Sequence, residues 1–121
     1  MSNDDIARAY LDAVVARDYD RVRSLLDDGF RLRDLSPTGC TQVDDVDEAL
    51  GDLRQFLDMF ESVDLLESDV YGFGSLTYVR ARLHFVHAEA GERILEQHHL
   101  LTIADDRISA IDELCTGLHA P

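Results

Sequence analysis

The hydrophobic period of this sequence changes after Phe60, and this change constrains the fold more than any other feature. Before Phe60, apolar residues recur mainly every three or four positions, which is the spacing of one face of an α-helix. After Phe60, they alternate with polar residues, as they do in strands that have one buried face. Helices that come before a run of strands are typical of the α+β class, in which the helices cover one face of an antiparallel sheet.

The first half of the chain predicts three helices, each with its own end signals. The first covers residues 2–18 and opens on Ser-Asn-Asp-Asp, a run of capping and acidic residues. The second is shorter, and we expect Asp20 to cap its start and Gly29 to end it. The third covers residues 44–60 and carries acidic side chains in its first turn, where the helix dipole favours them.

Five strands are expected, and four of them follow one another directly. The first ends at the turn over residues 36–39, between the second and third helices. The other four are joined by short turns, so they should pair as antiparallel neighbours. No repeat or linker divides the chain, so we expect one domain over residues 1–121. The expected strands are residues 30–34, 63–73, 76–88, 94–104 and 107–115.

The charge balance limits the partners of this chain. It has 25 acidic and 11 basic residues, a formal net charge of -14, and every basic residue is an arginine. Such a surface repels phosphate backbones, so we expect no nucleic-acid partner. Because lysine is absent, Schiff-base chemistry on the protein is excluded. Like-charge repulsion also predicts that added salt stabilises the fold.

Several sequence patterns that are absent limit the expected location and cofactors of the protein. No run of 18 apolar residues is present, so we expect no membrane-spanning helix. The first residues lack the basic start and apolar middle of a signal peptide, which favours a cytoplasmic protein. In that compartment Cys40 and Cys115 should be free thiols. No CxxC or HExxH motif occurs, so neither a metal nor another cofactor is predicted.

Two segments carry a resemblance to a known superfamily. They are AYLDAVVARDYDRVRSLLDDGFRLRD at residues 9–34 and HHLLTIADDRISAIDEL at residues 98–114. With the order of elements, they resemble the nuclear-transport-factor-2-like superfamily, which includes SnoaL-like polyketide cyclases, ketosteroid isomerases, limonene epoxide hydrolases and scytalone dehydratases. The resemblance covers nearly the whole chain. It implies a cone in which a curved, mostly antiparallel sheet wraps the N-terminal helices and leaves an internal apolar pocket.

Asp34 is the first candidate catalytic residue. It shares one face of its strand with Phe30 and Leu32, so its carboxyl group should point toward the apolar interior. Burial there would raise the pKa of Asp34 and suit proton abstraction near neutral pH. The alternative is that Asp34 only hydrogen-bonds the turn that begins at Ser36.

The resemblance to ketosteroid isomerase implies roles for three residues. Tyr10 falls where that enzyme has its oxyanion-binding tyrosine, and Asp34 where it has its general base. His99 falls where it has a second, protonated acid that donates a hydrogen bond to the oxyanion. A histidine can donate the same bond, but it can also act as a base.

Alternation along residues 94–104 places Gln97 and His99 inside the fold and His98 outside. Aligning the last strand with the family puts Glu113 and Cys115 inside as well. Arg80, Arg82 and His84 should form a row on the outer face of the sheet, either exposed or facing a dimer partner. Glu61 matches an acid of some epoxide-opening relatives, or is a solvated strand start. We expect the pocket to be lined by Leu32, Val14, Phe56, Gln97, Leu101, Glu113 and Cys115.

Two functions remain open from the sequence. The first is a cofactor-free acid–base enzyme acting on an apolar small molecule, by isomerisation, cyclisation, dehydration or epoxide opening. Asp34 would remove a proton, while Tyr10 and His99 would stabilise the developing oxyanion. The alternative is a non-catalytic ligand-binding or dimerisation module with the same fold. A homodimer that pairs through the outer face of the sheet is expected in either case, as is common among the relatives.

Overall fold

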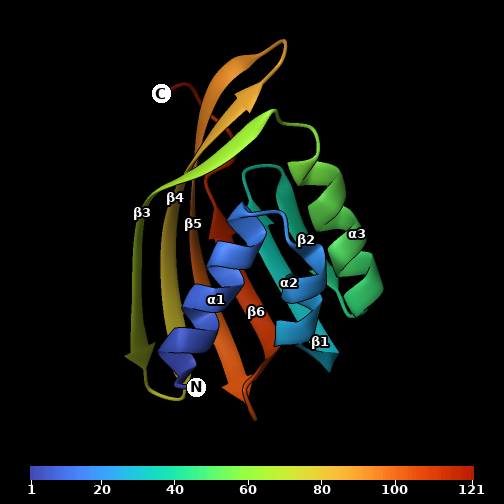
Figure 1. Cartoon of the computed structure of the whole chain (residues 1–121), viewed down its shortest axis with the longest axis vertical. Coiled ribbons are helices and arrows are strands. Elements are labelled where there is room, and N and C mark those ends of the chain that lie inside the picture. The colour runs from blue at the N-terminus through green and yellow to red at the C-terminus, as the bar shows by residue number, and fades with distance from the viewer.

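The computed structural model describes residues 1–121 and shows three helices packed on a six-stranded sheet that is not closed into a barrel. The strand order is β2-β1-β6-β5-β4-β3 (Figure 1). Only β1 and β6 pair in parallel, so the expected α+β class and mostly antiparallel sheet are confirmed. The elements are α1 (Asn3–Val15), α2 (Tyr19–Leu25), β1 (Leu26–Ser36), β2 (Gly39–Val43), α3 (Val46–Leu57), β3 (Ser62–Phe73), β4 (Leu76–His87), β5 (Gly91–Ala104) and β6 (Arg107–Cys115).

The ends of α1 and α2 follow from local capping and from pairing in the sheet. Ser2 and Asp5 form a reciprocal capping box at the start of α1. Asp18, not Asp20, caps α2, because its carboxylate accepts the backbone N–H of Arg21 at 3.1 Å. Gly29 does not end α2, contrary to the prediction. The chain is already extended at Leu26 because that residue pairs with β6, so Gly29 lies inside β1.

The sequence prediction missed β2. This strand is hydrogen-bonded to β1 across the tight turn that follows Ser36, and it lies at the edge of the sheet. Of its five residues only Val43 is buried, so no alternation of apolar and polar residues marks it as a strand. The helix that follows is also shorter than expected: Asp45 caps α3, and the helix ends at Leu57, before Phe60.

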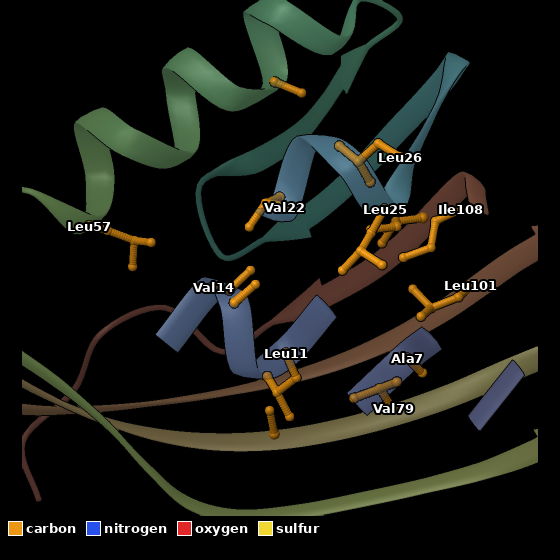
Figure 2. Packing of buried hydrophobic residues seen from close by; sticks show 14 of the residues in the cluster. Ala7, Leu11, Val14, Val22, Leu25, Leu26, Leu57, Val79, Leu101 and Ile108 are labelled. Carbon is orange, nitrogen blue, oxygen red and sulfur yellow. The ribbon is translucent and has the colours of Figure 1, made fainter. Parts of the chain in front are cut away.

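The helices cover one face of the sheet and leave the other face bare (Figure 1). Ala7 and Leu11 of α1 belong to the same buried cluster as Val79 and Leu101 of the sheet (Figure 2). Side chains of α2 extend this core toward β6, and α3 packs against β1 and β2. The inner face of the sheet therefore lies beneath the helices, where polar side chains are shielded from water.

None of the three helices has the length and the apolar content needed to cross a membrane.

Candidate active site

Three ionisable side chains lie side by side across three strands. Asp34 of β1 is the register partner of Glu113 of β6, and Glu113 is the register partner of His99 of β5. The row continues to Val79 of β4. Register partners point to the same face of a sheet, and His99 and Val79 are only 5% and 2% exposed. The row therefore lies on the face that the helices cover, where alternation in the sequence placed Asp34 and His99.

Both ring nitrogens of His99 face an oxygen atom. Nδ1 lies 2.9 Å from Oε2 of Glu113, but the direction of the N–H bond misses that oxygen, so the contact is a close charge pair more than a hydrogen bond. Nε2 lies 3.1 Å from Oε1 of Gln97. When the ring carries two protons, it can donate toward both oxygens. The resemblance implied that His99 donates a hydrogen bond to an oxyanion. For this, Nε2 would have to give up its contact with Gln97 and bond the ligand instead.

Asp34 is the residue of the row whose hydrogen-bonding capacity is least satisfied. Its Oδ1 atom is buried and has no hydrogen-bond partner, while its carboxyl group is within hydrogen-bonding reach of Glu113. Burial raises the pKa of Asp34 to about 6, with the charge and hydrogen bond of Glu113 adding to the effect and the charge of His99 opposing it. The turn does not use this carboxylate: Ser36 instead bonds Thr38 at 3.0 Å, so turn capping does not explain Asp34.

Glu113 carries the charge in this row. Burial acts to raise its pKa, but the charge of His99, in close contact with Oε2, and a hydrogen bond from Asp34 outweigh burial, so the pKa of Glu113 is lowered. Tyr10 reaches toward the same carboxylate from α1. Its pKa is raised by burial and by the charge of Glu113, so the phenol stays protonated near neutral pH. Tyr10 is partly buried and packs against the core beneath the helices.

The other expected pocket residues divide between this row and other parts of the core. Gln97 and Cys115 are register partners on one side of the row, and Leu32 and Leu101 flank it on the other, joined through Ile111. The pKa of the Cys115 thiol is raised by burial and by the nearby carboxylates, so this thiol is a poor nucleophile. Val14 is buried in the same core on the helix side.

Two expected residues lie elsewhere. Phe56 of α3 packs edge-on against Phe60 and Phe85, at ring-centroid distances of 5.3 and 5.7 Å. Phe85 lies in β4 six residues beyond Val79, so this aromatic cluster is separate from the row. Glu61 is exposed just before β3, where its backbone N–H bonds Val86. No group of three or more His, Cys, Asp or Glu side chains is arranged to hold a metal ion.

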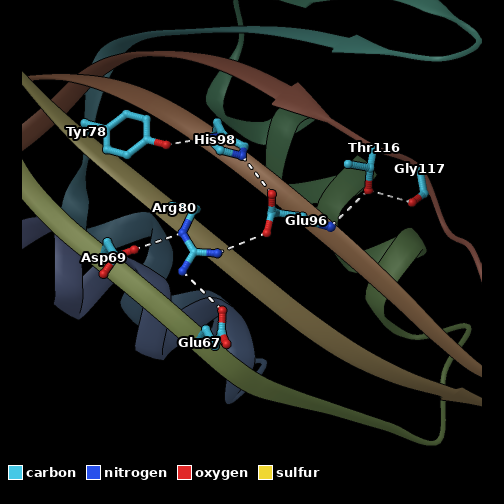
Figure 3. Close-up of polar contacts among 8 residues, drawn as sticks. All are labelled: Glu67, Asp69, Tyr78, Arg80, Glu96, His98, Thr116 and Gly117. Carbon is cyan, nitrogen blue, oxygen red and sulfur yellow. Dashed lines mark hydrogen bonds and ion pairs between the residues drawn. The ribbon is translucent and has the colours of Figure 1, made fainter. Parts of the chain in front are cut away.

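The bare face of the sheet carries a second polar cluster and a hollow. Arg80 bonds Asp69, Glu96 and Glu67 at 2.9, 3.0 and 3.2 Å, and His98 links Glu96 to Tyr78 (Figure 3). Beside this cluster lies a hollow of about 600 Å³. Alternation along residues 94–104 correctly placed His98 outside. The resemblance implied a pocket on the inner face, but this hollow opens on the outer face, where no signal in the sequence indicated one, and neither Tyr10 nor His99 lines it. Its lining comes mostly from outward positions: Arg33, Leu35, Cys40, Tyr71, Phe73, Tyr78, His98, Leu100, Asp112 and Leu114, together with Asp34 and Glu113.

Known families and solved structures share this architecture. A family model described as a SnoaL-like domain matches residues 7–111. No curated protein matches the sequence.

Three solved structures illustrate the shared fold. A limonene-epoxide-hydrolase-like epoxide hydrolase from M. tuberculosis has a TM-score of 0.76 and 13% identity, over 93% of this chain and 80% of that chain. A Catenulispora acidiphila protein with a ketosteroid isomerase-like fold, in complex with trimethylamine, has a TM-score of 0.77 and 14% identity, over 93% and 85%. A candidate SnoaL-like polyketide cyclase from Shewanella putrefaciens has a TM-score of 0.75 and 15% identity, over 95% and 80%.

Proposed function

This chain belongs to the SnoaL-like domain family, and from that premise we propose that it is a cofactor-independent acid–base enzyme acting on an apolar small molecule. One observation carries the proposal: Asp34 has a buried oxygen atom with no partner, beside a second carboxylate. Burial and Glu113 raise the pKa of Asp34 to about 6. A base whose pKa lies close to the working pH combines ionisation with a useful affinity for the proton.

The proposed first step is removal of a proton by Asp34. In isomerisation or cyclisation the proton comes from a carbon atom beside a carbonyl group, and the electron pair of the broken C–H bond moves onto the carbonyl oxygen. In epoxide opening the proton comes from water, whose oxygen forms a bond to an epoxide carbon while the bond from that carbon to the epoxide oxygen breaks and leaves its electron pair on that oxygen. The hydroxyl of Tyr10 donates a hydrogen bond to that oxygen, and His99 adds a second when Nε2 leaves Gln97. Asp34 then returns the proton to carbon or to the departing oxygen, which regenerates the carboxylate.

The relatives support a small-molecule substrate without selecting the reaction. One solved neighbour is an epoxide hydrolase and another is a candidate polyketide cyclase. Proton removal next to a stabilised oxyanion is common to isomerisation and aldol-type cyclisation, and an activated water molecule serves epoxide opening. The apolar surroundings of the row, Leu32, Leu101 and Val79, favour an apolar ligand.

Exchange of carbon-bound hydrogen in D2O tests the proposed step directly. The probe is 2-tetralone, an apolar cyclic ketone, and proton NMR follows the loss of its α-hydrogen signals. We expect Asp34→Asn to lower the enzymatic exchange rate by about 100-fold or more, the usual contribution of a positioned base. The matched control is Asp28→Asn, which removes an exposed carboxylate from the same strand. Exchange at the wild-type rate in Asp34→Asn would contradict the role of Asp34.

The non-catalytic alternative makes a different prediction in the same experiment. A binding module would shift the protein's NMR signals when 2-tetralone is added, but the α-hydrogens would exchange no faster than in buffer. The observation that keeps this alternative open is the engagement of both His99 nitrogens by Glu113 and Gln97. Epoxide opening is tested in parallel with styrene oxide, by measuring diol formation in the wild type and in Asp34→Asn.

We also propose a homodimer that pairs through the bare face of the sheet. Leu35, Tyr71, Phe73 and Leu114 are 50%, 51%, 63% and 55% exposed, and all four line the hollow there. Exposed apolar side chains gathered on one face are typical of an interface, and a face that meets its own copy gives a closed dimer. The outward row of Arg80, Arg82 and His84 expected from the sequence lies on the same face.

Light scattering tests the dimer. The expected mass is twice the 13.6 kDa of one chain. Phe73→Asp should weaken the association, because it places a charge among the apolar side chains of the interface. Met59→Asp is the control, since Met59 is 52% exposed but follows α3 on the helix side. A monomer mass for the wild type at micromolar concentration would contradict the proposal.

A further inference from the structure

We propose that Asp34 and Glu113 share one proton as a carboxyl pair, and that His99 keeps the negative charge on Glu113, so that the proton resides on Asp34. Glu113 is then a positioning residue, which acts on the substrate through Asp34. The inference rests on the function proposed for Asp34 and assigns the partner that controls its proton.

Glu113 occupies the central place in the row. Its carboxylate has His99 on one side, at 2.9 Å, and Asp34, its register partner on the neighbouring strand β1, on the other. Its side chain is 13% exposed, so little water stabilises the charge. Two adjacent carboxylates with so little water cannot both ionise cheaply, and one shared proton removes the repulsion.

The shared proton resides on Asp34 because of the position of His99. The positive charge of His99 adjoins Glu113 directly and favours the ionised form of that carboxyl group. Asp34 lies one strand further away and feels His99 less than it feels Glu113. The directions of the two pKa changes agree, since the pKa of Glu113 is lowered and that of Asp34 is raised. The protonated Asp34 therefore donates to the ionised Glu113.

No other charged group faces the pair of carboxyl groups. From α1 the facing group is the Tyr10 phenol, and from β6 it is the Cys115 thiol; both have raised pKa values and stay neutral. β2 places only Thr41 beside Asp34. No arginine acts on the pair, because Arg33 bonds Asp112 on the outer face at 2.9 Å.

The consequence is a change in the chemistry of Asp34 with pH. Below about pH 6, Asp34 holds the shared proton and can act only as an acid. Above that pH it is an ionised base beside the Glu113–His99 pair. Removing the charge of Glu113 while keeping its shape, as in Glu113→Gln, takes away both contributions of this neighbour to the raised pKa and leaves burial opposed by His99.

The test is a titration of carboxyl carbons by NMR in 13C-labelled protein from pH 4 to 8. In the wild type we expect Asp34 to titrate near pH 6. In Glu113→Gln its midpoint should fall by about one pH unit or more, the size of effect that a neighbouring charge exerts. Glu67→Gln, which removes an exposed carboxylate bound to Arg80 on the outer face, should leave the midpoint unchanged.

Two further variants keep the test decisive if Glu113→Gln does not fold. Glu113→Asp retains a carboxylate, so much of the raised midpoint of Asp34 should survive. His99→Asn removes the charge that opposes the shift, so the midpoint of Asp34 should rise instead. A wild-type Asp34 that titrates near 4, or a midpoint that none of the Glu113 and His99 variants moves, would overturn the shared proton.

The titration and the exchange assay can fail independently. If 2-tetralone does not exchange but Glu113→Gln lowers the titration midpoint of Asp34, the carboxyl pair is supported and the enzymatic function is refuted. If exchange is fast and depends on Asp34 but the midpoint of Asp34 does not change in Glu113→Gln, the enzymatic function is supported and the carboxyl pair is refuted. When both hold, the acidic limb of the pH–rate profile should move to lower pH in Glu113→Gln by the same amount as the midpoint.

Discussion

Asp34→Asn should stabilise this protein above pH 6, although it should abolish the proposed chemistry. The pKa of Asp34 is about 6 in the folded chain, against the value near 3.8 of an ordinary aspartate. Below the unfolded pKa, Asp34 is protonated in both states and its favourable contribution is complete. As pH rises through the folded pKa, that contribution is lost, because the native state must release a proton that it binds more tightly than the unfolded chain does. Asparagine has no proton to lose.

The magnitude follows from the size of the pKa change. A rise from 3.8 to about 6 corresponds to about 3 kcal/mol at roughly 1.4 kcal/mol per unit. Asp34 is only partly buried, so solvent screening reduces this to about 1–2 kcal/mol. For a chain of this length, about 1 kcal/mol corresponds to roughly 4 °C in Tm, so the variant should gain about 4–8 °C relative to the wild type between pH 4 and pH 7.5.

The assay is thermal unfolding followed by circular dichroism at pH 4, 5, 6 and 7.5. The measured quantity is the difference in Tm between variant and wild type at each pH, because general effects of the acidic surface act on both proteins and cancel. Asp28→Asn is the control, and its difference should stay constant across the range. If the difference for Asp34→Asn were also constant, Asp34 would not be desolvated in the native state, and the reasoning about its pKa would be wrong.

The remaining predictions concern charge, the core and the oxyanion donor. With a formal net charge of -14, the Tm should rise from low to high sodium chloride, and a flat or falling Tm would refute like-charge repulsion as a dominant cost. Arg80→Ala should lower the Tm more than Arg82→Ala, because only Arg80 binds three carboxylates; equal effects would show that the cluster adds no stability. Leu101→Ala should cost about 2–5 kcal/mol in urea unfolding, since Leu101 is fully buried, and a loss below about 1 kcal/mol would contradict its packing. Tyr10→Phe should slow 2-tetralone exchange by about 10-fold or more while keeping the Tm, and unchanged exchange would remove Tyr10 from the site.

Local patterns in the sequence predicted a large part of this fold. The change of period after Phe60 predicted helices followed by an antiparallel sheet, because burial on one face imposes its own spacing on each kind of element. The same alternation placed Asp34 and His99 on the inner face and His98 on the outer face. Capping was harder to predict, since Asp18 and Asp20 are chemically equivalent and only the backbone of α2 selects between them.

Two local features could not be predicted because tertiary pairing overrides the local signal. Gly29 is a good helix terminator, but pairing of Leu26 with Ile108 draws the chain into β1 before the glycine is reached. The edge strand β2 has only Val43 buried, so its conformation depends on backbone hydrogen bonds to β1 and not on any apolar pattern of its own.

Composition and hydrophobic period were enough to predict the class of fold, the acidic lysine-free surface and the inward faces of Asp34 and His99. The face of Glu113 did not follow from alternation, because both faces of its strand carry one acid, and the contacts among these residues depend on the tertiary structure. The parallel register of β1 and β6 sets Asp34 beside Glu113, and the antiparallel register of β6 and β5 sets Glu113 beside His99. These registers depend on the packing of the whole sheet beneath the helices, and a shift of one residue would turn Glu113 to the outer face. The carboxyl pair therefore exists only in the folded chain, because its members are distant in sequence and local propensity cannot align them.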